Sequence, residues 1–437
     1  MYLQKLSLVN FKNYTGTELS FSPKVNCFTG NNGEGKTNLL DAIYYLAFCK
    51  SFFNPVDSQN IKHEASFFVI QGWFDVNGTE EELYCAQKKN QKKQFKKNKV
   101  EYTRLAEHIG FLPLVMISPA DSDLIDGGSE SRRKFIDSVI SQYDGKYLAD
   151  LISYNRVVSQ RNVLLKQFSR SGNFDSVAIE LWDAQLVAYG MRLHETRKEF
   201  VKEFIPIFQH YYELITKGKE IVGLDYDSQL SNTNYRTLLQ DAVRKDLRME
   251  HTTVGIHRDD LDFTIKGFPV KKFASQGQQK SFLVALKFAQ YDFIKKIKAM
   301  KPVLLLDDIY DKLDDERVTA LMHLVSHGDF GQLFITDTHQ DRLAKIFKDT
   351  GVDYKLFSVK SDLVSEVKSV LFVVSLSELM RNEKSLRLLW CSVWFRTFTR
   401  GGHRLQRNIG HVYADRPSPV WCHRHSCCAN GPRLLGL

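Results

Sequence analysis

A glycine-rich segment near the N-terminus, GNNGEGKT at residues 30–37, constrains the fold of this 437-residue chain more than any other feature. A backbone that wraps a triphosphate cannot carry Cβ atoms where it closes on the ligand, which accounts for Gly30, Gly33 and Gly35. Successive N–H groups of such a loop point at phosphate oxygens, and a helix that begins there adds the positive end of its dipole. The pattern therefore predicts a nucleotide-binding loop between a strand and a helix.

The side chains of the loop suit ATP and Mg²⁺. Lys36 supplies a cation for the β- and γ-phosphates, and Thr37 supplies a hydroxyl for Mg²⁺. The flanks agree, because residues 25–29 have the apolar character of a strand and residues 38–48 have apolar side chains at helical spacing. A glycine-rich surface turn is the alternative. We expect these residues to contact the nucleotide: Gly30, Asn31, Asn32, Gly33, Glu34, Gly35, Lys36, Thr37 and Asn38.

A second nucleotide-site element, VLLLDD, lies far downstream at residues 303–308. Four consecutive apolar residues are typical of a strand buried on both faces, and ligands of open α/β sheets bind at the carboxyl ends of such strands. We expect Asp307 to complete the Mg²⁺ shell and Asp308 to orient or deprotonate the attacking water. The alternative is that both carboxylates only cap the exit of the strand.

The segment SQGQQK at residues 275–280 opens an amphipathic helix that extends to about residue 298. A serine at the N-cap, with glycine and glutamine in the first turn, makes an anion-binding helix end. One nucleotide has a single γ-phosphate, which Lys36 already contacts. We therefore expect this helix end to serve the ATP of a second copy of the chain, so that two ATP molecules lie between two protomers. An isolated helix cap is the alternative. The expected contacts are Ser275, Gly277 and Gln278.

In this order along one chain, these elements resemble the head domains of ABC-type ATPases, in their SMC-like DNA-repair branch. Within that branch the resemblance to the bacterial RecF family is close, and it covers residues 1 to about 368. Further motifs carry it: LSLVNFKNY at 6–14, ISPAD at 117–121, RRKFID at 132–137, GIHRDDL at 255–261, DKLD at 311–314 and FITDTH at 334–339.

The resemblance implies an α/β fold, a P-loop ABC-type ATPase head with an inserted helical lobe. It implies that Asp314 contacts the partner's active site across a dimer and that His339 senses the γ-phosphate in a catalytic role. For His339 the alternative is a hydrogen-bonded histidine at a strand end.

The function implied by the resemblance is ATP-driven dimerisation on gapped DNA or on single-strand/double-strand junctions, to promote recombinase loading. ATP hydrolysis would be slow and stimulated by DNA. The implied partners are RecR- and RecO-like mediators and a RecA-like recombinase.

The chain departs from the family pattern at three positions. Gln276 replaces the first of the two glycines of the general ABC signature, as RecF-like proteins allow. Asp308 stands where most ABC ATPases have glutamate, and the shorter acid implies slow turnover. Ile256 stands where RecF-like chains usually carry proline, which alters a turn and not the chemistry.

We predict an ATPase head made of residues 1–120 and 216–368, with the helical lobe at 121–215 inserted between them. In the lobe, apolar residues recur at three- and four-residue spacing over residues 129–168. A second helical run covers residues 175–215, with an interruption at Pro206. Stretches of this length suit a compact arm, not the long coiled coil of SMC proteins.

The last segment, residues 369–437, differs in composition from the rest of the chain. It uses arginine in place of lysine and holds four of the seven cysteines. We predict that it is disordered or read out of frame; zinc binding by its His and Cys residues is the less favoured alternative, because the spacing lacks a second ligand pair.

Charge gives little evidence on DNA. Residues 370–437 hold ten Lys or Arg and three acids, so this segment accounts for most of the net charge of +9. A local basic run could neutralise phosphates, but a solvated hairpin face is the favoured interpretation. The run consists of Lys88, Lys89, Lys92, Lys93, Lys96, Lys97 and Lys99.

The remaining cysteines, Cys27, Cys49 and Cys85, are too few and too scattered for a disulfide framework. With no signal peptide or membrane span in evidence, a cytoplasmic location is expected. Two other functions stay open: an ATP-binding DNA clamp with negligible hydrolysis, and a soluble ABC ATPase subunit of a membrane complex.

Overall fold

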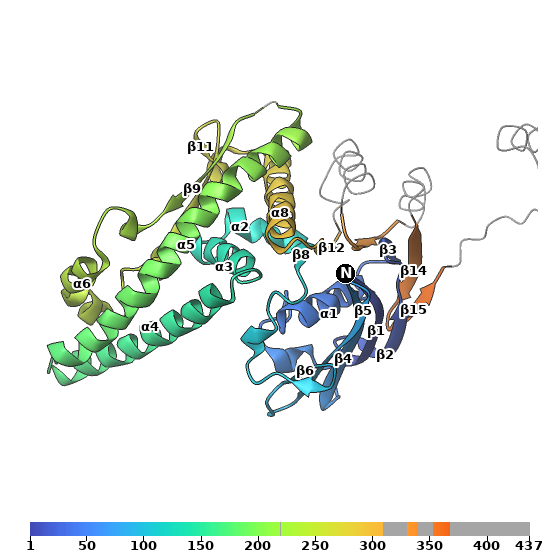
Figure 1. Cartoon of the computed structure of the whole chain (residues 1–437), viewed down its shortest axis with the longest axis horizontal. Coiled ribbons are helices and arrows are strands. Elements are labelled where there is room, and N and C mark those ends of the chain that lie inside the picture. Colours follow the sequence, from blue (N-terminus) through green and yellow to red (C-terminus); the bar gives the residue numbers. More distant parts are fainter. Residues whose placement is uncertain (219, 309–329, 340–352, 368–437) are drawn as a thin grey trace, which may run out of the picture. The chain divides into compact units, whose positions relative to one another are not determined.

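The computed structural model describes residues 1–218, 220–308, 330–339 and 353–367 (Figure 1). The chain divides into two units, Met1–Lys368 and Ser369–Leu437. The second unit and Asp314 lie outside the described residues, so the predictions for them stay predictions.

A six-stranded sheet of order β15-β14-β3-β13-β12-β8 forms the centre of the first unit. Its strands run parallel from β8 to β14, and β15 is an antiparallel edge strand. All residues of the four strands β3, β13, β12 and β8 are buried, as expected for a parallel sheet covered on both faces. Their bounds are β3 Val25–Thr29, β8 Leu114–Ile117, β12 Val303–Leu306, β13 Leu333–Asp337, β14 Tyr354–Lys360 and β15 Leu363–Glu366.

A second, antiparallel sheet has the order β2-β1-β4-β5-β6-β7. The helix α1 (Lys36–Phe48) packs between the two sheets, so nearly all of its side chains are buried. This helix is hydrophobic almost all round because it has a sheet on either side. The strands are β1 Tyr2–Phe11, β2 Tyr14–Ser20, β4 Phe67–Val76, β5 Thr79–Lys88, β6 Gln94–Lys97 and β7 Val100–Glu101.

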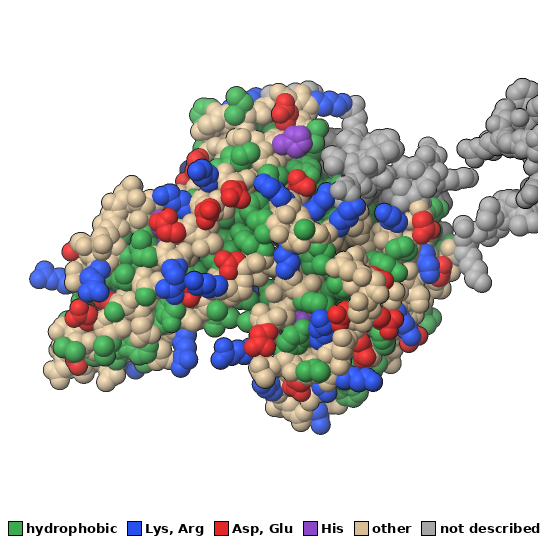
Figure 2. Space-filling view, viewed as in Figure 1, with side chains coloured by type: hydrophobic (Ala, Val, Ile, Leu, Met, Phe, Trp, Pro, Cys, Tyr) green, Lys and Arg blue, Asp and Glu red, His purple; other side chains and the backbone are tan. Residues whose placement is uncertain are grey.

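The basic run lies on the β5–β6–β7 hairpins of this second sheet, and it is not uniformly solvated. Lys93 forms an ion pair with Asp57 at 2.7 Å, and Lys97 pairs with Glu81 at 3.2 Å. The other lysines are exposed, apart from the half-buried Lys96. Figure 2 shows basic and acidic side chains interspersed over the visible face. On this face, charge alone does not mark a DNA-binding surface.

The other face of the parallel sheet packs against a helical lobe. The sequence predicted one helical run over residues 129–168. This prediction was wrong, because the structure has two helices there. Asp144 ends the intervening turn and accepts hydrogen bonds from the N–H groups of Lys146 and Tyr147, so it caps the second helix. The first helices of the lobe are α2 Asp123–Asp126, α3 Ser129–Ile140, α4 Gly145–Ser171 and α5 Ser176–Thr216.

The predicted interruption at Pro206 was also wrong, since α5 continues through this residue. Proline removes one backbone donor from a helix interior and so weakens it locally. Here the buried rings on either side, Phe204 and Phe208, hold α5 against its neighbours. Tertiary packing therefore outweighs the local preference of the sequence.

The segment after α5 packs on the lobe. A three-stranded sheet of order β11-β10-β9 contacts α3 and α5, and α6 contacts α4 and α5. The boundary predicted at residue 216 assigned this segment to the head. Among the described residues after 216, α8 packs on the parallel sheet and the strands that follow it are part of that sheet. The bounds are β9 Val222–Asp227, α6 Tyr235–Met249, β10 Asp260–Ile265, β11 Phe268–Pro269, α7 Val270–Phe273 and α8 Gln276–Lys298.

Alternate side chains of the parallel strands belong to different cores. In β12, Leu304 and Leu306 pack with α8 and the lobe, whereas Val303 and Leu305 pack with α1 and the antiparallel sheet. The parallel sheet is thus the layer on which both halves of the head are built. Within the described ranges, no helix is both long and apolar enough to cross a membrane.

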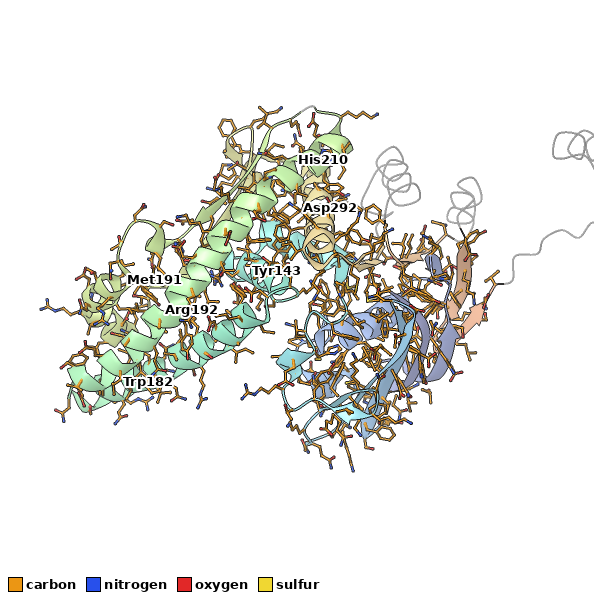
Figure 3. All side chains as sticks on the ribbon, in the orientation of Figure 1. Tyr143, Trp182, Met191, Arg192, His210 and Asp292 are labelled. Carbon is orange, nitrogen blue, oxygen red and sulfur yellow. The ribbon has the colours of Figure 1, made fainter. Side chains whose placement is uncertain are left out.

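A buried arginine on α5 forms ion pairs with two other segments of the lobe. Arg197 on α5 is 2% exposed and pairs with Asp137 of α3 and with Asp259, at 2.8 and 3.0 Å. It also donates to the hydroxyl of Tyr147 at 2.9 Å. Arg192, on the same helix and labelled in Figure 3, has a side chain that is 47% exposed and pairs with Asp150 at 2.7 Å.

We predict that Arg197→Ala lowers the free energy of unfolding by about 3–5 kcal/mol, because it leaves the buried carboxylate of Asp259 and the part-buried carboxylate of Asp137 without their cation. The matched variant Arg192→Ala removes an exposed pair on the same helix and is expected to cost about 0–1 kcal/mol. Urea unfolding followed by circular dichroism measures both. Equal losses in the two variants would contradict the structural role given to Arg197.

Candidate nucleotide-binding site

The glycine-rich loop joins β3 to α1, as predicted. Its three glycines all have positive φ angles, of +157° at Gly30, +84° at Gly33 and +99° at Gly35. A Cβ atom on Gly30 would lie 2.3 Å from the carbonyl oxygen of Val359, and one on Gly35 would lie 2.4 Å from the side-chain amide of Asn13. The loop is therefore confined by its neighbours as well as by its own backbone conformation.

Lys36 is held within the loop. Its Nζ donates hydrogen bonds to the carbonyl oxygens of Gly30 at 2.8 Å and of Asn31 at 3.0 Å. The residue is 4% exposed. These bonds hold the ammonium group beside the curved backbone. A phosphate bound there would contact both the cation and the backbone N–H groups.

The loop and the acidic strand meet through one hydrogen bond. Thr37 Oγ1 donates to Asp307 Oδ1 at 2.9 Å, although the two residues are 270 positions apart. Thr336, at the end of the neighbouring strand β13, donates to the same oxygen at 2.9 Å. Parallel pairing of β3, β13 and β12 places all three groups at the carboxyl edge of the sheet.

A hydroxyl and a carboxylate are the oxygen ligands that Mg²⁺ prefers, and this ion usually takes few protein ligands together with substrate phosphates. Thr37 and Asp307 fit that role. Burial raises the pKa of Asp307 to about 6, and the hydrogen bonds from Thr336 and Thr37 oppose the shift. A divalent cation at this position would favour the ionised carboxylate.

The other two residues predicted to be catalytic lie at the same edge. The backbone N–H of Asp308 donates to Thr336 Oγ1 at 2.9 Å, and Asp308 has a φ of +44°. His339 follows β13, is exposed, and its backbone N–H donates to Asp337 Oδ1 at 3.0 Å. Both are therefore near the strand ends that carry Asp307 and Thr336, and their chemical roles stay predictions.

The predicted signature residues lie at the start of α8. Ser275 is its N-cap, and Ser275 and Gln278 cap one another reciprocally in a capping box. Their side-chain hydrogen bonds go to each other and to Glu220, and in the described residues none joins either side chain to the loop at 30–37. Ser281 Oγ donates to the carbonyl oxygen of Gly277 at 3.0 Å.

Two residues without a role predicted from the sequence, Asn13 and Tyr14, brace the loop. The Asn13 side-chain amide donates to the carbonyl oxygens of Ser361 at 2.6 Å and of Glu34 at 3.4 Å, and it accepts from Asn38 at 2.7 Å. The hydroxyl of Tyr14 donates to the carbonyl oxygen of Gly35 at 3.0 Å. The only sequence signal was their place in the N-terminal motif. The side chain of Asn38 supports Asn13 in this arrangement.

The turn between β14 and β15 is hydrogen-bonded to the loop. The carboxylate of Glu34 accepts hydrogen bonds from the backbone N–H and the hydroxyl of Ser361. Glu34 was predicted to contact the nucleotide, and its carboxylate anchors the loop to this turn.

Comparison with known proteins agrees with this geometry. The family described as RecF/RecN/SMC N terminal domain matches residues 2–361. The chain is 50% identical over 369 residues to the DNA replication and repair protein RecF of Bacteroides fragilis, a match that covers 84% of this chain and 99% of the relative. The chain belongs to the RecF family. To the RecF of Flavobacterium johnsoniae it is 52% identical over 359 residues, or 82% and 100% of the two chains.

Solved structures confirm the predicted fold class. A structure of the recombination mediator protein RecF with ATP, from the RecFOR pathway, has a TM-score of 0.76 and 28% identity, and it covers 84% of this chain and 98% of that one. The Smc head domain of Pyrococcus furiosus has a TM-score of 0.50 at 17% identity, which shows a shared fold alone. The RecF resemblance and the ABC-type α/β head predicted from the sequence are thus confirmed.

We predict that Gly35→Ala weakens ATP binding at least about tenfold, because it combines a left-handed backbone, which costs about 1–3 kcal/mol for other residues, with a clash against Asn13. Gly33→Ala shares the backbone strain but has open space around the new methyl group, so a smaller loss is expected. Titration with a fluorescent ATP analogue measures both.

The control is Gly16→Ala on β2, where the space is open and φ is ordinary. If Gly35→Ala binds ATP as tightly as the Gly16→Ala protein, the bracing of the loop by Asn13 is not needed for binding.

Proposed function

We propose that this chain is an ATP-dependent DNA-binding protein of recombinational repair and replication. It binds ATP and Mg²⁺ at the loop, dimerises with ATP on gapped or single-strand/double-strand junction DNA, and promotes recombinase loading. ATP hydrolysis, slow and stimulated by DNA, then releases the dimer. The mediators would be RecR- and RecO-like proteins, acting with a RecA-like recombinase in the cytoplasm.

The observation that carries ATP binding is the Thr37–Asp307 hydrogen bond. It brings together the loop hydroxyl and the strand carboxylate, the two groups that hold Mg²⁺ in P-loop NTPases. The RecF structures named for their complexes with ATP and ATPrS support the same ligand for this chain.

Dimerisation is supported by the place of Ser275. Ser275 is exposed at the N-terminus of α8, and within the residues that the structure describes its hydroxyl forms no hydrogen bond with the loop of its own protomer. ATP can favour a closed dimer only through contacts that the separate protomers lack. Ser275 and Gly277 on the γ-phosphate of the second protomer's ATP would supply that difference in affinity.

Hydrolysis would depend on the second carboxylate of the acidic strand. Asp308 would orient the attacking water, and a carboxylate shorter than glutamate suits slow turnover. A clamp that holds ATP with negligible hydrolysis is the second candidate, favoured by the same residue. Family membership favours either of these over the subunit of a membrane complex.

The test is the rate of ATP hydrolysis by the full chain as a function of protein concentration, with and without gapped DNA. We expect the rate to rise faster than linearly with protein, to increase with gapped DNA, and to be lost in Lys36→Ala and Ser275→Arg. Two matched variants at exposed positions, Lys24→Ala and Ser171→Arg, are expected to behave as wild type.

A rate that is linear in protein, indifferent to DNA and unchanged in Ser275→Arg would contradict the composite site. No turnover with intact ATP-dependent DNA binding would favour the clamp.

A further inference from the structure

A carboxylate far from the phosphate loop contacts the signature helix. Glu220, between α5 and β9, accepts a hydrogen bond from the side-chain amide of Gln278 at 2.5 Å through Oε1. Its Oε2 accepts from the hydroxyl of Tyr212 at 2.8 Å. Lys266 Nζ lies 3.7 Å from Oε1, and the side chain of Glu220 is 15% exposed. Three groups thus hold one carboxylate against the start of α8.

This contact determines the orientation of the Gln278 amide. An ionised carboxylate only accepts hydrogen bonds, so the NH₂ end of the amide must face Glu220. The carbonyl end is then left for the backbone N–H of Ser275, to which Gln278 Oε1 is 2.7 Å. A reversed amide would place its oxygen against the carboxylate, which is repulsive.

The hydroxyl of Ser275 belongs to the same capping box as the Gln278 amide. Its Oγ accepts from the backbone N–H of Gln278 at 3.3 Å. An oxygen that accepts at this position keeps its own proton for another acceptor. The capping box therefore leaves Ser275 as a donor at the N-terminus of α8, where anions bind.

The charge state of Glu220 agrees with this geometry. Burial raises its pKa, but the hydrogen bonds from Gln278 and Tyr212 and the charge of Lys266 outweigh burial, so the net shift is downward. The carboxylate stays ionised at neutral pH and keeps accepting.

We infer that Glu220 is a positioning residue of the composite ATP site: it orients Gln278, which holds Ser275 ready to donate to the γ-phosphate bound by a second protomer. The inference rests on the proposed function of Ser275. Nothing in the sequence points to Glu220, which lies 58 residues before Gln278.

The test measures ATP-dependent dimerisation of the full chain with ATP and Mg²⁺ by sedimentation, alongside ATP affinity in dilute protein. We expect Glu220→Ala to raise the dimer dissociation constant by about tenfold, the effect of losing one charge-assisted hydrogen bond. ATP affinity of the protomer stays at the wild-type value, because the loop at 30–37 is untouched. A purely structural defect would weaken both dimerisation and the binding of ATP by the protomer. The matched control is Glu195→Ala, an exposed carboxylate on α5.

A double-mutant cycle tests whether Glu220 acts through Gln278. If it does, Glu220→Ala adds no further loss of dimerisation to a Gln278→Ala protein. Losses that multiply would overturn the inference. Should Glu220→Ala fail to fold, Glu220→Gln keeps the shape and one acceptor, and a smaller loss of dimerisation is expected; an unchanged dimer would overturn the inference there too.

The variant Ser275→Arg distinguishes a failure of the composite ATP site from a failure of the role given to Glu220. If it abolishes ATP-dependent dimerisation while Glu220→Ala is like wild type, the role of Glu220 is wrong and the composite site stands. If Ser275→Arg dimerises normally, the composite site fails and the role of Glu220 fails with it.

Discussion

Parallel pairing of β3, β13 and β12 is the constraint on which the candidate site depends. The three strands bring Thr37, Thr336 and Asp307 to one edge of the sheet. In the sequence, the whole helical lobe lies between Thr37 and Asp307. Fully buried strands allow this, because each face of the sheet carries its own core. The hydrogen bonds at this edge depend on the register of the parallel strands. The residues that form them need not be close in sequence.

The helical lobe bears on function through α8. This helix packs on α5 and on β8 of the parallel sheet, while its N-terminus is held by Glu220 from the segment that packs on the lobe. A second link, the buried pair of Lys287 with Asp121 at 2.7 Å, joins the same helix to the turn after β8. The signature residues are thus fixed by both the head and the lobe. A site shared between protomers needs such rigidity, since any freedom of Ser275 would be lost on dimerisation.

Local signals predicted the parts of the site that depend on local physics. Glycines predicted the loop, the apolar run at 303–306 predicted a buried strand, and Ser275 predicted the start of α8. Local signals failed where long-range packing decides. Pro206 did not interrupt α5, because buried rings hold the helix across it. Asn13 gave no signal beyond its place in the N-terminal motif and Glu220 gave none, since each acts on residues distant in sequence.

Mixing two inactive variants tests the shared site most directly. Lys36→Ala removes the loop cation and keeps the signature, whereas Ser275→Arg keeps the loop and blocks the signature. A heterodimer of the two therefore contains one intact site, made of the loop from one protomer and Ser275 from the other. The account predicts that an equimolar mixture regains up to about a quarter of the wild-type hydrolysis rate, since about half of the dimers are mixed and each has one working site. A mixture no more active than the sum of the separate variants would contradict it.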